Sequence, residues 1–200
     1  MSDSAYKTNA PRKRLETFEW DNIWWEHTEN HTAKRILYIG DSISCGIRRL
    51  ITSLSNETIL CDGFGTSKAV DNPFLIPGIE LCMKQQSKCD GILFNNGLHG
   101  GHLSAPEYAQ HLEQVLQFLV ETKKPVFVLL TTTDIVNPER SARVPVRNQV
   151  AESLAKKYGL PVIDLYTVSA ENQALHSPDG VHFTEEGYAL MAKRILESIG

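Results

Sequence analysis

The sequence predicts an α/β protein, a three-layer α/β/α sandwich around a central parallel sheet of about five strands. Two features of the sequence support this prediction. Short runs of apolar or β-favouring residues alternate with stretches of helical periodicity along most of the chain. The strand-like runs are apolar almost throughout, rather than at every second position, and this is typical of parallel strands that are buried on both faces.

The first half of the pattern begins with an apolar run that ends in Gly-Asp-Ser. A helix is expected directly after it, because Ile47, Leu50 and Leu54 recur at helical spacing. Two more strands and one more helix complete this half. The expected strands are residues 35–39, 58–61 and 91–95, and the expected helices are residues 43–55 and 77–86.

The second half contains the most strand-like run of the chain, residues 125–130, which is entirely apolar or β-favouring. A helix is expected before it at residues 105–122, and another after it at residues 143–158. A short strand at residues 162–165 and a final helix at residues 184–199 follow. Strands and helices therefore alternate throughout, as a parallel sheet with helical crossovers requires.

The 200 residues suit one domain, which we expect at residues 31–200, preceded by an N-terminal extension at residues 1–30. Residues 1–15 are expected to be mobile. Residues 15–27 are expected to pack on the domain as a flap or short helix, with core packing favoured over lining of a substrate cleft. The large apolar side chains of this segment are Phe18, Trp20, Ile23, Trp24 and Trp25.

The composition is that of an ordinary globular protein, with 42% hydrophobic and 22% charged residues. A net charge of −4 offers no general attraction to nucleic acid or to anionic membranes. The absence of an apolar run suited to a membrane span or a signal peptide favours a cytoplasmic location, although removal of a signal peptide would leave the same pattern. The oligomeric state has no signature in the sequence. Reduced thiols are expected at Cys45, Cys61, Cys82 and Cys89.

Ser42 lies on the expected turn between the strand at residues 35–39 and the helix at residues 43–55. Such a turn exposes a hydroxyl group beside the free backbone N–H groups of a helix start. A nucleophilic serine needs both, because negative charge develops next to it during the reaction. Taken alone, the segment favours an ordinary helix cap, and Asp41 is expected to fix the turn by accepting backbone N–H bonds.

A second segment changes this balance. Asp179 and His182 are three residues apart in a loop that contains Pro and Gly, just before the last expected helix. A serine nucleophile requires a base within hydrogen-bond reach, and the base requires a partner that orients it. His182 has the chemistry of such a base, and Asp179 is close enough in the chain to orient it. The two segments together predict a catalytic site that includes Ser42.

The Gly40-Asp41-Ser42 motif and the Asp179-x-x-His182 motif, in this order and at this separation, resemble those of the SGNH/GDSL hydrolase family. The resemblance extends from about residue 36 to the C-terminus. It implies a flavodoxin-like fold and a catalytic triad, with Ser42 as nucleophile, His182 as general base and Asp179 as the orienting carboxylate. Neither a cofactor nor a metal ion is expected.

The same resemblance implies an oxyanion hole with three donors: the N–H of Ser42, a glycine N–H after the second strand, and an asparagine side chain after the third. Gly63 and Gly65 are candidates for the glycine, and Gly65 is preferred because small hydroxyl residues follow it. The third motif departs from the family's Gly-x-Asn-Asp. Aligning its glycine puts His99 at the asparagine position, whereas aligning its asparagine selects Asn96. Either side chain can donate a hydrogen bond, so both remain candidates.

Arg143 and Arg147 lie one turn apart at the start of the helix expected at residues 143–158. A solvated helix face is the favoured interpretation of this pair, and contact with an anionic or sugar substrate is the alternative.

These residues predict a serine esterase or acylhydrolase whose partner is a small-molecule acyl ester, with short acyl groups, acetyl foremost, and a carbohydrate as one candidate alcohol. Two alternatives belong to other classes. One is a non-catalytic domain of the same fold that binds a carbohydrate or an acyl group, which the altered third motif would favour. The other is metal-assisted hydrolysis, with His99, His102, Asp179 and His182 as candidate ligands.

Overall fold

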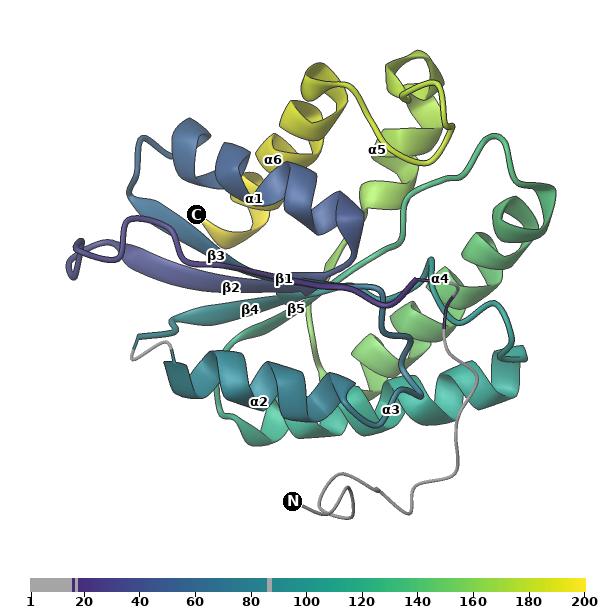
Figure 1. Ribbon diagram of the computed structural model, residues 1–200, viewed down its shortest axis with the longest axis horizontal. Coiled ribbons are helices and arrows are strands. Elements are labelled where there is room, and N and C mark those ends of the chain that lie inside the picture. Colours follow the sequence, from purple (N-terminus) through teal and green to yellow (C-terminus); the bar gives the residue numbers. More distant parts are fainter. Residues whose placement is uncertain (1–15, 17, 86–87) are drawn as a thin grey trace, which may run out of the picture.

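The computed structural model describes residues 16, 18–85 and 88–200, so the mobility expected for residues 1–15 falls outside the described residues. Figure 1 shows three layers, with a central sheet seen nearly edge-on and helices on both sides of it. The predicted α/β/α class is confirmed.

The sheet has six strands in the described part of the chain, compared with the expected number of about five. Their order is β1-β3-β2-β4-β5-β6, and every neighbouring pair is parallel except β1–β3. The parallel strands thus have the doubly wound, flavodoxin-like order that extends in both directions from β2. The strands are β1 (Asp21–Trp24), β2 (Lys34–Gly40), β3 (Ile59–Thr66), β4 (Gly91–Phe94), β5 (Val126–Leu129) and β6 (Val162–Ile163).

The additional strand, β1, corrects the expectation of a flap or short helix at residues 15–27. It pairs antiparallel with β3, from Asp21↔Thr66 to Trp24↔Gly63. A strand forms here because β3 would otherwise leave an open row of backbone N–H and C=O groups at the sheet edge. β1 is therefore an edge strand of the sheet. The residues that precede it lie near the carboxyl end of β3, because Asp21 pairs with Thr66.

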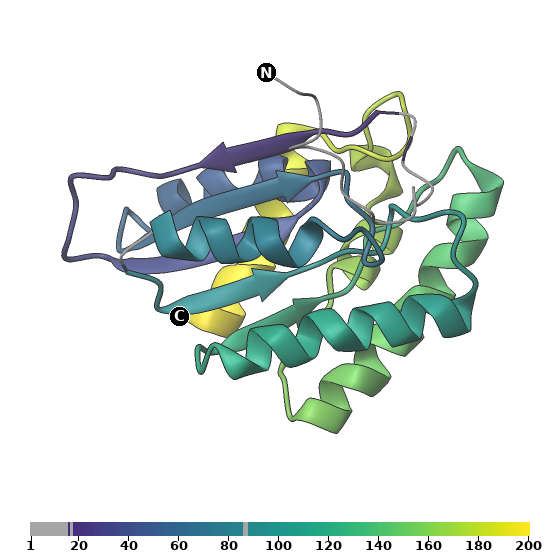
Figure 2. The same cartoon turned by 60° about the horizontal axis from the view of Figure 1, so that its bottom comes forward.

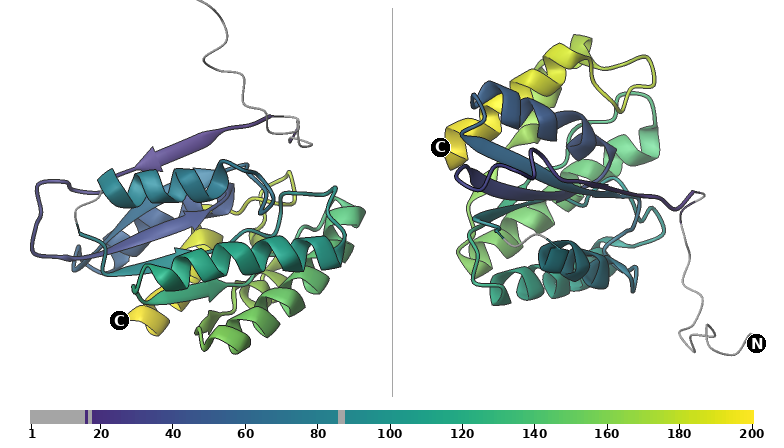
Figure 3. Two further views of the ribbon diagram at one scale, coloured as in Figure 1. Left: turned by 90° about the horizontal axis from the view of Figure 1, so that it is seen from below. Right: turned by 60° about the vertical axis from the view of Figure 1, so that its left-hand side comes forward.

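Helices cover both faces of the sheet. α1, α5 and α6 lie on one face, and α2, α3 and α4 lie on the other (Figure 1). Figures 2 and 3 show α2 and α3 crossing the second face, with β1 at one edge of the sheet. The helices are α1 (Ser42–Leu54), α2 (Leu75–Gln85), α3 (Ala105–Glu121), α4 (Pro138–Tyr158), α5 (Leu165–Glu171), the 3-10 turn η2 (Gln173–Leu175) and α6 (Glu185–Ile199).

α4 and α5 differ most from the sequence-based expectation. α4 begins at Pro138, earlier than expected, because Asn137 caps it: its side chain accepts a hydrogen bond from the Arg140 N–H at 2.9 Å. α5 was not expected, since seven residues are too few to show a clear helical period. Both helices lie on the chain between β5 and the loop that contains Asp179 and His182.

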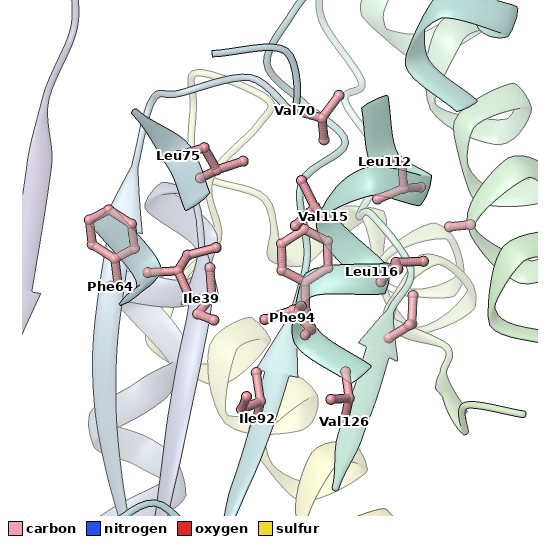
Figure 4. Packing of buried hydrophobic residues seen from close by; sticks show 14 of the residues in the cluster. Ile39, Phe64, Val70, Leu75, Ile92, Phe94, Leu112, Val115, Leu116 and Val126 are labelled. Atoms are coloured by element: carbon pink, nitrogen blue, oxygen red, sulfur yellow. The ribbon is translucent and has the colours of Figure 1, made fainter. Parts of the chain in front are cut away.

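The core consists of two hydrophobic clusters, one between the sheet and each helix layer. Alternate residues of β2 supply both: Leu37 and Ile39 pack beneath α2, α3 and α4, whereas Ile36 and Tyr38 pack against α1 and α6. Figure 4 shows the first cluster, in which Ile39 lies in one layer with Phe64 and other apolar side chains. Burial on both faces explains why the strands are apolar throughout.

The four cysteines are free thiols, as the sequence predicts, and three of them are buried. No helix in the described part of the chain combines the length and the apolar character needed to cross a lipid bilayer. The topology also indicates where a site should lie. The strand order reverses between β2 and β4, and ligands of open parallel sheets bind at such a point, beyond the carboxyl ends of the strands.

Candidate active site

Ser42 is the first residue of α1 and directly follows the turn at the end of β2. The preceding residue, Asp41, caps the helix: its Oδ1 accepts a hydrogen bond from the Ile43 N–H at 2.9 Å. Ser44 Oγ donates to the Asp41 carbonyl at 2.6 Å and holds the same turn. The structural role expected for Asp41 is confirmed. The hydroxyl of Ser42 is thereby fixed at a helix start, where the backbone N–H groups lack helical partners.

The structure brings Ser42 together with His182 and Asp179. His182 Nε2 lies 2.7 Å from Ser42 Oγ, and His182 Nδ1 lies 2.6 Å from Asp179 Oδ2. Asp179 Oδ1 accepts two further hydrogen bonds, from the N–H groups of Val181 (3.0 Å) and His182 (2.9 Å). An uninterrupted chain of hydrogen bonds thus connects a carboxylate, an imidazole and a hydroxyl group.

These contacts set the protonation states. The hydrogen bond from the His182 side chain, followed by the two backbone N–H bonds, lowers the pKa of Asp179 to about 2. The carboxylate is therefore ionised at neutral pH and accepts the proton on Nδ1 of His182. The other ring nitrogen, Nε2, is then the acceptor that faces the hydroxyl of Ser42 when the ring is neutral.

We expect His182→Ala to raise the pKa of Asp179 from about 2 towards its ordinary value of 3.8, because the largest stabilising contact of the carboxylate is lost. A lowered pKa in the folded state contributes stability above pH 3.8, and this contribution disappears as the pH falls through about 2. Carbon-13 NMR of the Asp179 carboxyl group measures the change. His31→Ala, an exposed histidine before β2, is the control. An unchanged pKa in His182→Ala would contradict the assigned contact.

A turn of unusual backbone geometry holds the Asp179–His182 loop in place. Gly180 has φ +73°, in the left-handed region that favours glycine. A Cβ at this position would lie 2.2 Å from Cγ2 of Val136, so the loop approaches the segment after β5 very closely. The Ile135 N–H donates to the Gly180 carbonyl at 2.9 Å and fixes this contact.

Ser42 and His182 line a cleft of about 910 Å³. Phe18 and Trp20 also line this cleft, and Phe18 is 81% exposed. The preference for core packing is therefore wrong for these two aromatic residues, although Trp25 does pack against the core. The charged and histidine side chains that line the cleft are Glu16, His99, His102, Glu139, Arg140, Arg143 and His182.

The candidates for the oxyanion hole lie in different environments. His99 lines the cleft together with Ser42. Asn96 is 5% exposed, and its Nδ2 donates to the Lys68 carbonyl at 2.7 Å. Gly65 and Gly63 lie inside β3; Gly65 has a paired residue on each side, in β1 and in β2. The expectation that the glycine follows the second strand is wrong, because pairing with β1 and β2 extends β3 beyond its predicted end.

Two further histidines of the cleft have carboxylate partners. His99 Nδ1 lies 3.7 Å from Glu16 Oε1, and His102 Nε2 lies 3.0 Å from Asp71 Oδ2. Glu16 also accepts a hydrogen bond from the Gly100 N–H at 2.6 Å. Its interaction with His99 is the main reason that its pKa falls to about 2. Among the described residues, no three or more His, Cys, Asp or Glu side chains are arranged to hold a metal ion.

Arg147 is a buried residue beside the site whose role the sequence analysis misjudged. It is 2% exposed, and its guanidinium donates to the carbonyls of Gly97 (2.9 Å), His99 and Gly100 (2.5 Å). The guanidinium carbon also lies 4.4 Å from the centre of the Tyr108 ring. Burial lowers the pKa of Arg147 to about 10, so it stays charged at neutral pH. The solvated helix face favoured from the sequence is wrong for this residue, which holds the loop that carries His99.

The signal for Arg147 was present in the spacing of α4. Its neighbours on the helix, Val144, Asn148 and Ala151, are buried with it and recur at helical period. A charged residue within such a pattern indicates a buried arginine with specific partners. Arg143, one turn earlier, is only half-buried and lines the cleft.

Solved structures with the same fold include several hydrolases. A lipolytic protein of the G-D-S-L family from Veillonella parvula has a TM-score of 0.69 and 23% identity, covering 82% of this chain and 97% of that chain. A lipase/acylhydrolase from Enterococcus faecalis has a TM-score of 0.69 and 19% identity, with coverage of 83% and 95%. An acetyl xylan esterase has a TM-score of 0.66 and 16% identity, with coverage of 83% and 100%. At these identities the likeness shows a shared fold.

A family model also matches part of the sequence. Residues 102–195, which include Asp179 and His182, match the GDSL-like lipase/acylhydrolase family. Over this part of the chain the sequence is similar to that family, and the solved structures share its fold. The family match and the shared fold together support a carboxylic ester hydrolase. A comparison with curated protein sequences gives no match.

Proposed function

We propose that this protein is a serine esterase that removes short acyl groups, acetyl foremost, from small esters that include acetylated carbohydrates. The observation that supports the catalytic assignment is the chain of hydrogen bonds from Asp179 through His182 to Ser42, with distances of 2.6 and 2.7 Å. This is the arrangement that a nucleophile, its base and an orienting carboxylate require.

The proposed reaction has two stages. Ser42 Oγ attacks the ester carbonyl carbon while its proton passes to Nε2 of His182, and a tetrahedral intermediate forms. The bond to the alcohol then breaks, and the alcohol leaves with the proton from His182. Water attacks the acyl-enzyme with His182 again as the base, which releases the acid and restores Ser42. Asp179 keeps Nδ1 protonated and stabilises the imidazolium in both stages.

The tetrahedral oxyanion needs donors that are already in position, each contributing about 3–4 kcal/mol. We assign the N–H of Ser42, at the start of α1, and the ring of His99, which lines the same cleft. Asn96 is less suited because it does not line the cleft, and one of its two amide N–H groups is bonded to the Lys68 carbonyl. Gly65 is less suited because it lies within β3 and does not line the cleft. His99 thus replaces the asparagine that is usual in the family.

Two observations favour a small acyl ester on a polar alcohol. Trp20 and the exposed Phe18 offer apolar faces at the cleft, which suit the stacking of a sugar ring. The other lining residues are mostly polar or charged, which suits a hydroxylated alcohol better than a long acyl chain. One protein of the same fold is an acetyl xylan esterase, although its identity to this chain is 16%.

A panel of substrates tests this function. We expect turnover of 4-nitrophenyl acetate and of acetylated xylo-oligosaccharides, with rates that fall steeply for 4-nitrophenyl esters longer than the butyrate. The initial rates of nitrophenol and acetate release provide the measurement. Highest rates with long-chain esters would contradict the short-acyl assignment. Binding of the acetylated sugar without any release of acetate would instead favour a non-catalytic domain.

A further inference from the structure

Arg143 is a half-buried cation in the cleft that contains Ser42. It lies in the second turn of α4, and its Nη2 donates to the Leu98 carbonyl across a distance of 3.3 Å. Its Nη1 and Nη2 also border Gly101, so that a Cβ there would lie 3.4 and 3.6 Å from them. The buried Nε of Arg143 has no hydrogen-bond partner within the described part of the protein. Among the described residues, its buried Nε therefore lacks a partner, and the bond to the Leu98 carbonyl is long.

The two neighbouring arginines of α4 differ from Arg143 in this respect. Arg140 forms an ion pair with the buried carboxylate of Asp134 at 3.1 Å. Arg147 is bonded to three backbone carbonyls. Arg143 has no carboxylate within ion-pair distance among residues 16, 18–85 and 88–200, even though Glu139 precedes it by one helical turn. Glu16 and Glu139 act on its charge only at longer range.

Burying a guanidinium without a hydrogen-bonding partner costs free energy. An anionic ligand that forms an ion pair with the guanidinium offsets this cost. Burial, followed by the positive charge of Arg140, lowers the pKa of Arg143, and the more distant carboxylates of Glu16, Glu139 and Asp134 offset this only in part. A guanidinium nevertheless stays protonated in proteins, and its planar fork matches the two oxygens of a carboxylate. A carboxylate that enters the cleft from solvent therefore has the chemistry to pair with Arg143.

We propose that Arg143 binds a carboxylate of the substrate, so that this enzyme prefers acyl esters that carry a negative charge beside the ester bond. The proposal rests on the esterase function proposed for Ser42 and refines its substrate class. The carboxylate belongs either to the alcohol or to the acyl group of the ester. In both cases it forms an ion pair with the guanidinium of Arg143.

Matched pairs of substrates separate these two sources. The first pair carries the charge on the alcohol: 4-acetoxybenzoate against its neutral amide, 4-acetoxybenzamide. The second pair carries it on a short acyl group: phenyl hydrogen malonate against the corresponding malonic monoamide. We expect the wild-type protein to favour the anion in at least one pair by about tenfold in kcat/KM, as for a charge-assisted hydrogen bond.

Arg143→Gln should remove that preference by lowering kcat/KM for the anionic member of the pair. Arg143→Lys, which keeps the charge but not the fork, should retain part of the preference. Arg140→Gln is the matched control, because its charge is already paired with Asp134, and this variant should keep the ratio of the two rates. If Arg143→Gln is inactive on both substrates, Arg143→Lys decides: a retained preference supports the proposal, and its loss overturns it.

Equal wild-type rates within both pairs would overturn the assignment of Arg143 while leaving the esterase function intact. Absence of turnover for all four substrates by the wild-type protein would instead overturn the proposed esterase function. A preference that Arg143→Gln leaves unchanged would show that another group binds the carboxylate, and would also overturn the proposal.

Discussion

Replacing Ser42 with Ala is expected to lower kcat for 4-nitrophenyl acetate by roughly 10³- to 10⁶-fold. The substitution removes the oxygen that lies 2.7 Å from His182 Nε2, and no acyl-enzyme can then form. Binding should change little, because Ser42 is small and α1 is capped by Asp41 and not by Ser42. We therefore expect the loss to appear in kcat much more than in KM, and initial-rate kinetics separate the two.

The matched control is Ser53→Ala, an exposed serine near the end of the same helix. It should leave kcat and KM as they are in the wild-type protein. Circular dichroism and thermal melting of both variants report whether the fold is retained. A Ser42→Ala variant that is folded and fully active would remove Ser42 as the nucleophile.

Replacing Arg147 with Met is expected to destabilise the fold and to impair the site together. The substitution removes the guanidinium and leaves the carbonyls of Gly97, His99 and Gly100 without their buried donor. We expect the free energy of unfolding to fall by about 3 kcal/mol. For a chain of this size that cost corresponds to a fall in Tm of roughly 6–12 °C. Because the loop carries His99, the proposed oxyanion donor, kcat should also fall by about 10²-fold.

Arg194→Met, at an exposed position in α6, is the control for the loss of an arginine charge. Its ion pair with Glu197 is on the surface, where such pairs contribute little, so Tm and kcat should hardly change. Equal effects of Arg147→Met and Arg194→Met on Tm would contradict the role of Arg147 in holding the loop.

Much of the fold follows from local features of the sequence. The strands and helices that flank Ser42 are identified by hydrophobic periodicity and by an N-cap, and these signals act within a few residues. The Asp179–His182 pair is similarly local, since three residues separate its members. The resemblance of these motifs to a hydrolase family joined two segments that lie far apart in the chain. The structure brings their side chains to hydrogen-bond distance.

The features for which the sequence-based expectations were wrong depend on distant partners. The length of β3 and the presence of β1 result from pairing between strands, which periodicity within either segment does not encode. Arg147 was misjudged because a charged residue near a helix start usually faces solvent, whereas here three carbonyls of the loop after β4 compensate its burial. The same loop decides the environments of His99 and Asn96, so their roles could not be separated before its path was known.

The central claim is that Ser42 carries the acyl group during turnover. Mass spectrometry of a reaction quenched with acid, after brief mixing with excess 4-nitrophenyl acetate, tests it most directly. The account predicts that a fraction of the protein gains one acetyl group, that the peptide containing Ser42 carries it, and that Ser42→Ala lacks it. Rapid turnover with an acetyl group on another residue, retained in Ser42→Ala, would contradict the account.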